Sequence, residues 1–218
     1  NRAARSALIR IISASFSAAE SRSASRWGRN SGAWGYGGDA SSLGDAERIN
    51  NWLTANPNIH IKEINGGAYH IVLWVKNDGN DEIHCFGRNS SYELADGTNT
   101  ARRDPTLATK FMEYMNTNNV TIKKIVCGWH HTIVLFSNNV LCGSGQNGQY
   151  ELANNSTTDS SFTECTQFNE YASSNSTQIV NFTCNSSNTI VFYDNNVVLG
   201  IGNNSSGEFG IGNNTDYD

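Results

Sequence analysis

Histidine is the side chain best suited to acid–base or metal chemistry near neutral pH, and two of the five histidines recur in one sequence context. His70 lies in "INGGAYHIVLWV" and His131 in "IVCGWHHTIVLF", each three residues after a glycine and just before an apolar run. Two such residues could be paired as metal ligands or as an acid and a base. Their recurrence in two copies of one pattern instead indicates a repeated packing or hydrogen-bonding role, so we expect both to be structural.

The five cysteines offer neither a metal site nor a nucleophile by their spacing. Their number is odd and none belongs to a C-x-x-C pair, so neither a disulfide framework nor a zinc site is predicted. Cys127 and Cys184 share one repeat position, which Gly66 occupies in another copy, and this favours small buried residues. A catalytic cysteine needs a base and an electropositive pocket, and no pattern here indicates one.

The glycine-rich runs, such as "GIGNNSSGEFGIGNN", lack the lysine of a G-x-x-x-x-G-K-[ST] phosphate loop, and no helix start follows them. Arg102-Arg103-Asp104 is the one compact charge cluster. We expect a solvated loop there, with a partner contact as the alternative. The sequence therefore predicts no catalytic residue, no metal site and no cofactor.

These residues belong to units that repeat along the chain. The run just quoted is similar to "CGSGQNGQYELANN", "CFGRNSSYELADGTN" and "RWGRNSGAWGYGGDA". The alignment places Gly28, Gly87, Gly143 and Gly202 at one position, at spacings of 59, 56 and 59 residues. Repetition at such a period is typical of arrays of supersecondary units.

The arginine-rich start of the chain resembles a targeting segment, but it also fits the repeat. Ser13 precedes Gly28 by 15 residues, as Gly128 precedes Gly143. We therefore interpret this segment as a degenerate first repeat rather than a targeting signal. We expect one region spanning 1–218, with repeats at about 8–40, 61–100, 122–156 and 179–214.

Each unit predicts short antiparallel strands joined by tight turns. "IKKIVCG", "HTIVLFS" and "VLCGSG" place β-branched and aromatic residues between glycine and asparagine. Asn138-Asn139 and Asn195-Asn196 separate apolar runs, and asparagine tolerates the positive φ of hairpin turns. The many glycines and asparagines are thus expected to make the turns of the fold.

The pattern G-x-x-H-[TS] followed by W-G-x-N-x-x-G-Q-x-G, at a period of about 50 to 60 residues, resembles the repeat of the regulator of chromosome condensation family. "CGWHHTIVL…GSGQNGQYEL" is the best copy, and the match covers essentially the whole chain. The resemblance implies an all-β fold: a β-propeller of four repeats of about 58 residues, part of a larger seven-bladed ring. The family's tryptophan survives only as Trp27, and its histidine is replaced by Phe16 and Asn188 in two copies.

The resemblance also implies a platform for other proteins rather than an active site. We expect no enzyme but a non-catalytic interaction scaffold, or a structural or regulatory propeller within a larger assembly. Tyr69, Trp129 and His130 are the expected partner-binding residues, because they are bulky positions inside G-x-x-H and aromatic residues make good contact anchors. The alternative is guanine-nucleotide exchange on a Ran-type small GTPase, an activity of the family's founding member.

Charge and hydropathy limit the partners further. The first 29 residues hold six arginines, whereas the rest of the chain is acidic and the net charge of the whole chain is −5. This excess of acidic residues disfavours direct nucleic-acid binding. No apolar run reaches the roughly 18 residues of a membrane span. We expect the partners to be other proteins of a large cytoskeletal or organellar assembly, with a small GTPase as the alternative and no membrane or nucleic acid. We expect an intracellular location, cytoplasmic or cytoskeletal first and nuclear second.

Overall fold

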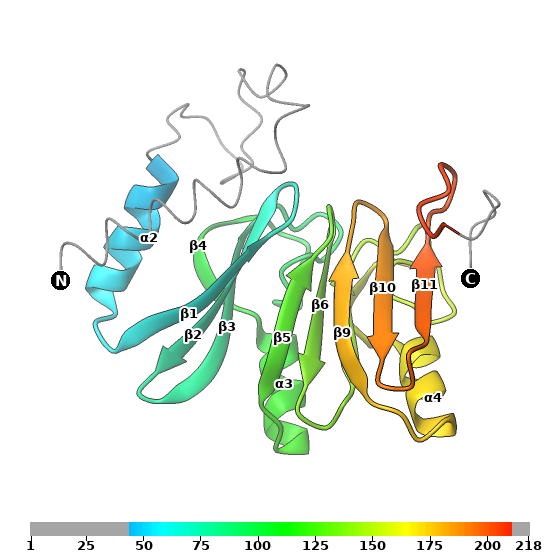
Figure 1. Ribbon diagram of the computed structural model, residues 1–218. Helices are drawn as coiled ribbons and strands as arrows, with labels where there is room; N and C mark the ends of the chain where they lie inside the picture. The colour runs from blue at the N-terminus through cyan, green and yellow to red at the C-terminus, as the bar shows by residue number, and fades with distance from the viewer. Residues whose placement is uncertain (1–43, 211–218) are drawn as a thin grey trace.

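The computed structural model describes residues 44–210, whose strands form three antiparallel sheets standing side by side (Figure 1). Strands adjacent in sequence are adjacent in each sheet, so each sheet is one blade. Blade 1 consists of β1 (Ile59–Gly66), β2 (His70–Asn77), β3 (Asn80–Gly87) and β4 (Arg102–Leu107). Blade 2 consists of β5 (Ile122–Cys127), β6 (His131–Phe136), β7 (Leu141–Gly145) and β8 (Ser160–Glu164). Blade 3 consists, within the described residues, of β9 (Ile179–Cys184), β10 (Asn188–Tyr193) and β11 (Val198–Gly202).

This mostly β architecture of antiparallel sheets confirms the predicted fold, which is part of a β-propeller. The expected first repeat, 8–40, lies outside the described residues, as do the last residues of the fourth.

A short helix precedes the first strand of each blade: α2 (Gly44–Ala55), α3 (Thr109–Asn118) and α4 (Thr166–Ser174). The sequence predicted strands and turns but no helix here, because its many asparagines and serines favour turns. The helices form because apolar residues four apart face the core: Phe111 and Met115 in α3, Phe168 and Ala172 in α4. No helix within 44–210 is long and apolar enough to cross a membrane.

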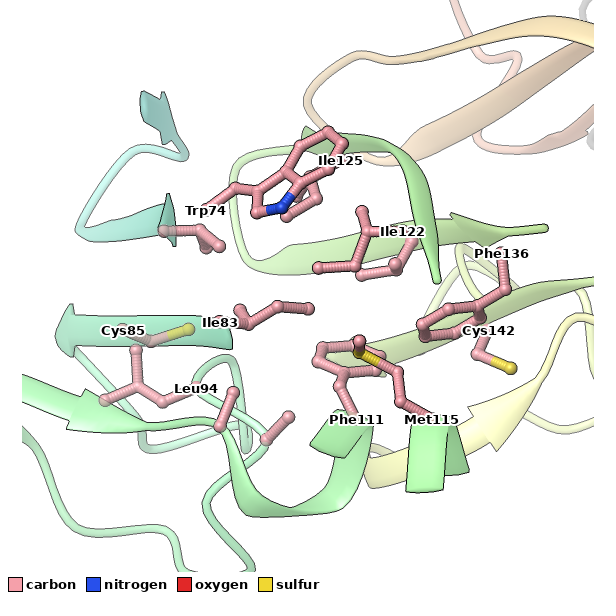
Figure 2. Packing of buried hydrophobic residues seen from close by; sticks show 14 residues of the cluster. Trp74, Ile83, Cys85, Leu94, Phe111, Met115, Ile122, Ile125, Phe136 and Cys142 are labelled. Atoms are coloured by element: carbon pink, nitrogen blue, oxygen red, sulfur yellow. The ribbon is translucent and has the colours of Figure 1, made fainter. Parts of the chain in front are cut away.

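Two of the three apolar clusters of the described residues lie between neighbouring blades, and the third packs α2 against blade 1. Figure 2 shows Trp74 and Ile83 of blade 1 facing Ile125 and Phe136 of blade 2, with Phe111 of α3 closing the lower side. A second cluster of the same kind joins blade 2, α4 and blade 3. Full burial of a large apolar side chain contributes about 1.5–3 kcal/mol. The blades are thus held together mainly by the faces that they bury against each other.

The first strand of every blade carries a β-bulge at the same repeat position. The unpaired residues are Lys62, Lys123 and Val180, and all three are exposed. A bulge adds local twist to its strand. Its recurrence shows that the three blades share backbone detail as well as topology.

The third strand of each blade ends in a glycine, and the pairing of this glycine corrects the sequence alignment. Gly87, Gly145 and Gly202 pair with the first residues of β2, β6 and β10 and lie 58 and 57 residues apart. The alignment of Gly143 with Gly87 and Gly202 was wrong by two residues, because "CGSG" contains two glycines. The 15-residue spacing that aligned Ser13 with Gly128 therefore does not hold.

These glycines are required by backbone geometry. Their φ angles are 109°, 116° and 123°, a region that side chains disfavour. A Cβ at Gly145 would lie 2.3 Å from the carbonyl oxygen of His130. The predicted turn role of asparagine is confirmed at Asn139 and Asn196, with φ of 67° and 65°.

We expect Gly145→Ala to lower the free energy of unfolding by about 2 to 4 kcal/mol, because it combines a positive φ with a backbone clash. Gly148→Ala is the matched control. A Cβ at Gly148 meets no atom within 4 Å, so its effect should stay within about 0.5 kcal/mol. Urea unfolding of both variants measures the difference, and equal stabilities would contradict the assigned strain.

Candidate protein-binding face

The loops that carry the predicted binding residues leave one end of the blades, at the top in Figure 1. They are the β1–β2 loop (67–69), the β5–β6 loop (128–130) and the β9–β10 loop (185–187). The long β3–β4 and β7–β8 loops leave the blades at the same end. They share one end because antiparallel strands reverse direction at every turn. Tyr69 lies in the first of them, and Trp129 and His130 lie in the second.

The two recurrent histidines connect neighbouring blades through a threonine. His70 Nε2 lies 2.9 Å from Thr132 Oγ1, and that hydroxyl donates to the Glu93 carbonyl at 3.0 Å. His131 Nε2 lies 3.3 Å from Thr189 Oγ1, which donates to the Glu151 carbonyl at 2.8 Å. A hydroxyl has one hydrogen, so each imidazole must donate from Nε2. We call this imidazole–hydroxyl–carbonyl chain the His–Thr clasp.

The glycine of G-x-x-H makes room for the clasp. A Cβ at Gly67 would lie 2.3 Å from Cε1 of His70, and one at Gly128 would lie 2.0 Å from Cε1 of His131. In blade 3 both positions change together, to Asn185 and Asn188. The motif is therefore a packing unit in which the glycine is needed only where the imidazole is present.

Both clasp histidines are fully buried and neutral. Burial lowers the pKa of His70 to about 3, with smaller contributions from His131 and His130. Burial likewise lowers the pKa of His131 to about 3. Neither Nδ1 atom has a hydrogen-bond partner in the described structure. This geometry gives both residues the structural role expected of them.

Trp129 is held by its backbone and exposed by its side chain. Its carbonyl accepts from Ala68 N at 2.9 Å, and its N–H donates to the Ser186 carbonyl at 3.2 Å. The loops of all three blades are thereby joined at this residue. Its side chain is nevertheless 58% exposed, although apolar rings of this size are usually buried.

Beside Trp129, a polar and aromatic cluster spans blades 1 and 2. The rings of Tyr69 and His130 stack at 5.4 Å with 5° between their planes. Arg88 Nη1 donates to His130 Nδ1 at 3.1 Å, and Arg88 Nε lies 3.2 Å from Glu93 Oε1. We call Tyr69, Arg88, Glu93 and His130 the Arg88 cluster.

The charges of the cluster balance internally. Burial raises the pKa of Glu93, and Arg88 opposes that shift. Burial, with a smaller contribution from Arg88, lowers the pKa of His130 to about 4. His130 is therefore neutral near pH 7, and it accepts a hydrogen bond from Arg88 rather than competing with it.

Of the three predicted binding residues, the structure stacks Tyr69 on His130 and places Trp129 next to His130 on the same loop. Arg88 and Glu93 were not among the residues predicted from the sequence. Recurrence offered a signal for the glutamate, because Glu151 and Glu208 follow their glycines at the same interval. The signal for Arg88 was weaker, because its position is arginine again at Arg29 but Gln146 and Asn203 in the other two copies.

The long loops are organised by a buried asparagine at one repeat position. Asn89 Oδ1 accepts from Leu94 N at 2.9 Å, and its amide donates to the Thr98 carbonyl at 2.8 Å. Asn147 makes the same pair of contacts with Leu152 N and the Ser156 carbonyl, at 2.8 Å and 2.6 Å. The loops that frame the face are thus ordered from within.

Arg102-Arg103-Asp104 do not form the expected loop, although Arg103 and Asp104 are solvent-exposed as expected. These residues begin β4. Arg102 Nε lies 2.6 Å from Asp96 Oδ2, and Arg48 of α2 lies 3.1 Å from Asp104 Oδ1. The cluster therefore ties the outer strand to the β3–β4 loop and to the preceding helix.

The cysteines are free thiols. Burial raises the pKa of Cys184 to about 12, and it raises the pKa values of Cys85, Cys127, Cys142 and Cys165 as well. All five are therefore protonated near neutral pH. Within 44–210, no group of three or more histidine, cysteine or acidic residues is placed to hold a metal ion.

Comparison with known proteins places these features in a family context. Residues 80–135 match the Regulator of chromosome condensation (RCC1) repeat. The matched unit runs from β3 to β6 and so joins two blades. An RCC1 repeat-containing protein of Dictyostelium discoideum is 26% identical over 155 residues, which are 70% of this chain and 30% of that protein.

Two solved structures have the same fold. Human WBSCR16 is 16% identical with a TM-score of 0.53, and the match covers 72% of this chain and 39% of that one. Prp20p of Saccharomyces cerevisiae is 14% identical with a TM-score of 0.53, and the match covers 66% and 32%. The chain thus spans 30–39% of the length of these relatives.

We expect His131→Asn to lower the free energy of unfolding by about 1 to 3 kcal/mol at pH 7, through loss of the clasp. The deficit should shrink as the pH falls from about 6 to 4. Below its ordinary pKa of 6.5 the imidazole binds a proton in the unfolded chain but stays neutral when folded, so acid destabilises the wild type more than the variant. The shrinkage should approach about 1.4 kcal/mol per pH unit.

Chemical unfolding at several pH values measures this deficit. His60→Asn, at an exposed position of β1, is the control and should change stability by less than about 0.5 kcal/mol at pH 7. A deficit for His131→Asn that is constant from pH 7 to pH 4 would contradict a buried neutral imidazole.

Proposed function

We propose that this chain, a run of regulator of chromosome condensation repeats that forms part of a β-propeller, is a non-catalytic platform that binds another protein through Trp129 and the Arg88 cluster. One observation carries the proposal. The backbone of Trp129 is bonded to the loops of both neighbouring blades, while its side chain is 58% exposed. A large ring held rigidly in solvent loses little conformational freedom when a partner covers it.

The composition of the face supports the same proposal. Trp129, Tyr69 and Arg88 are of the three residue types that most often dominate binding energy at protein interfaces. Arg88 is 31% exposed and is held by Glu93 beneath it. The face therefore offers an aromatic anchor and an oriented guanidinium edge. A fitting partner would bring an apolar side chain to Trp129 and a hydrogen-bond acceptor to Arg88.

The competing function is nucleotide exchange on a small GTPase. Prp20p has been described for its binding properties to Gsp1p and histones, but its similarity to this chain supports only a common fold. The two functions differ in one readout. A platform binds its partner without changing nucleotide release, whereas an exchange factor accelerates it.

We expect Trp129→Ala to weaken partner binding at least about tenfold, because it removes the exposed anchor. Crosslinking and mass spectrometry on the full-length protein identify the partner, and titration with that purified partner measures the affinity. Val180→Ala is the matched control, because Val180 is 55% exposed on a first-strand bulge away from these loops. Its affinity should equal that of the wild type.

Equal affinities for wild type, Trp129→Ala and Arg88→Ala would contradict the assignment of this face. Acceleration of labelled-nucleotide release from a purified Ran-type GTPase would replace the platform with an exchange factor.

A further inference from the structure

Trp129 is the one large apolar side chain that the proposed binding face exposes within residues 44–210. The other exposed large apolar side chains of these residues are Val180, Phe192 and Val198, and all three belong to blade 3. An amphipathic helix binds through a row of apolar contacts that recur every three to four residues. A single exposed ring does not provide such a row, so the chemistry of this face does not suit a partner helix.

Main-chain hydrogen bonds within the molecule already engage the loops around Trp129. The N–H groups of Ala68 and Trp129 donate at 2.9 Å and 3.2 Å, and the carbonyls of Tyr69 and His130 accept at 2.7 Å and 2.8 Å. A partner strand that extends a sheet needs unpaired N–H and C=O groups. These groups are not available to it, so side chains must recognise the partner.

The charge of the face does not favour an acidic or phosphorylated partner. Arg88 Nε lies 3.2 Å from the Glu93 carboxylate and donates to Ser90 Oγ at 2.7 Å, and Arg88 Nη1 donates to His130 Nδ1 at 3.1 Å. Recognition of phosphate or of several carboxylates uses clusters of arginines. One guanidinium that is already paired with a carboxylate suits a neutral acceptor, such as a peptide carbonyl.

The small size of this surface restricts the partner further. Ordering a flexible chain costs conformational entropy at every residue, and one exposed ring with its neighbours offers little contact to offset that cost. A segment that is ordered before it binds avoids most of the cost. The polyproline II conformation meets this condition, because proline fixes φ and the main chain makes no internal hydrogen bonds. Its carbonyls therefore remain free to accept.

We propose, on the basis of the platform function above, that the partner presents a proline-rich segment in the polyproline II conformation to Trp129 and the Arg88 cluster. Its proline rings pack on the indole of Trp129 and beside the stacked rings of Tyr69 and His130. Its carbonyls accept from Arg88 and from the indole N–H, which makes no hydrogen bond with the described residues. Surfaces lined by aromatic rings are a recurrent mode of binding such segments.

A fluorescein-labelled decaproline peptide is the probe, because a run of prolines adopts this conformation by itself. Fluorescence anisotropy with the full 218-residue chain should show saturable binding with a dissociation constant on the order of 0.1 mM, as suits a small contact. A glycine–serine peptide of equal length, which is flexible, should bind at least about tenfold more weakly.

Variants of the chain locate the contact. Trp129→Ala should weaken decaproline binding at least about tenfold. Val180→Ala, at a similarly exposed side chain (55%) away from these loops, should bind like the wild type. Circular dichroism melting verifies that both variants are folded.

Three results would overturn the proposal. The first is a wild type that does not bind decaproline. The second is equal binding of the glycine–serine peptide, because recognition would then not depend on the polyproline II conformation. The third is decaproline binding that Trp129→Ala leaves unchanged, because the contact would lie elsewhere.

The partner identified by crosslinking separates this inference from the platform function. We expect saturating decaproline to displace that partner. A partner that Trp129→Ala weakens but decaproline does not displace would leave the platform standing and show the proline-rich segment to be wrong. A partner affinity that depends on neither Trp129 nor Arg88 would contradict the platform itself, and this inference with it.

Discussion

The His–Thr clasp is the interaction on which the arrangement of this molecule depends. Apolar faces hold neighbouring blades together, but hydrophobic contact is non-directional and would tolerate sliding of one sheet over another. The chain from His70 to Thr132 to the Glu93 carbonyl has one geometry that satisfies every donor, and burial makes its loss expensive. The clasp therefore sets the register between blades, and with it the positions of the loops that leave their upper ends.

The two junctions share the clasp and differ in charge. At the first, Arg88 faces the buried carboxylate of Glu93 at 3.2 Å. At the second, the corresponding Glu151 accepts from Gln149 N at 2.7 Å and from the Gln146 amide at 3.2 Å. Burial raises the pKa of both glutamates, but among the described residues only the first has an arginine against it. Identical backbone geometry thus carries different electrostatics from blade to blade, which lets one scaffold present distinct local surfaces.

Sequence recurrence identified the repeat, the strands, the asparagine turns and the structural character of His70 and His131, because each of these is a local property copied from unit to unit. It misplaced Gly143, since two glycines in one motif cannot be told apart without the partner strand. It did not predict the connector helices, whose apolar residues are fixed by packing between blades. It also missed Arg88, because the contact with His130 joins residues 42 positions apart in two different units. Repetition shows which residues are equivalent, but not which of them meet across a junction.

The motif G-x-x-H divides its own residues between two tasks. The outer positions are constrained, because the glycine must admit the imidazole and the imidazole must reach the next blade. The inner positions are free of both demands, and they vary from Ala68-Tyr69 to Trp129-His130 to Ser186-Ser187. The residues that flank the tryptophan in the neighbouring loops, Ala68 and Ser186, are small and bond to its backbone, so its ring has room to stand in solvent. Variation in the side chains at the inner positions therefore changes the exposed surface, whereas the clasp and the backbone hydrogen bonds of Trp129, which do not depend on those side chains, join the blades.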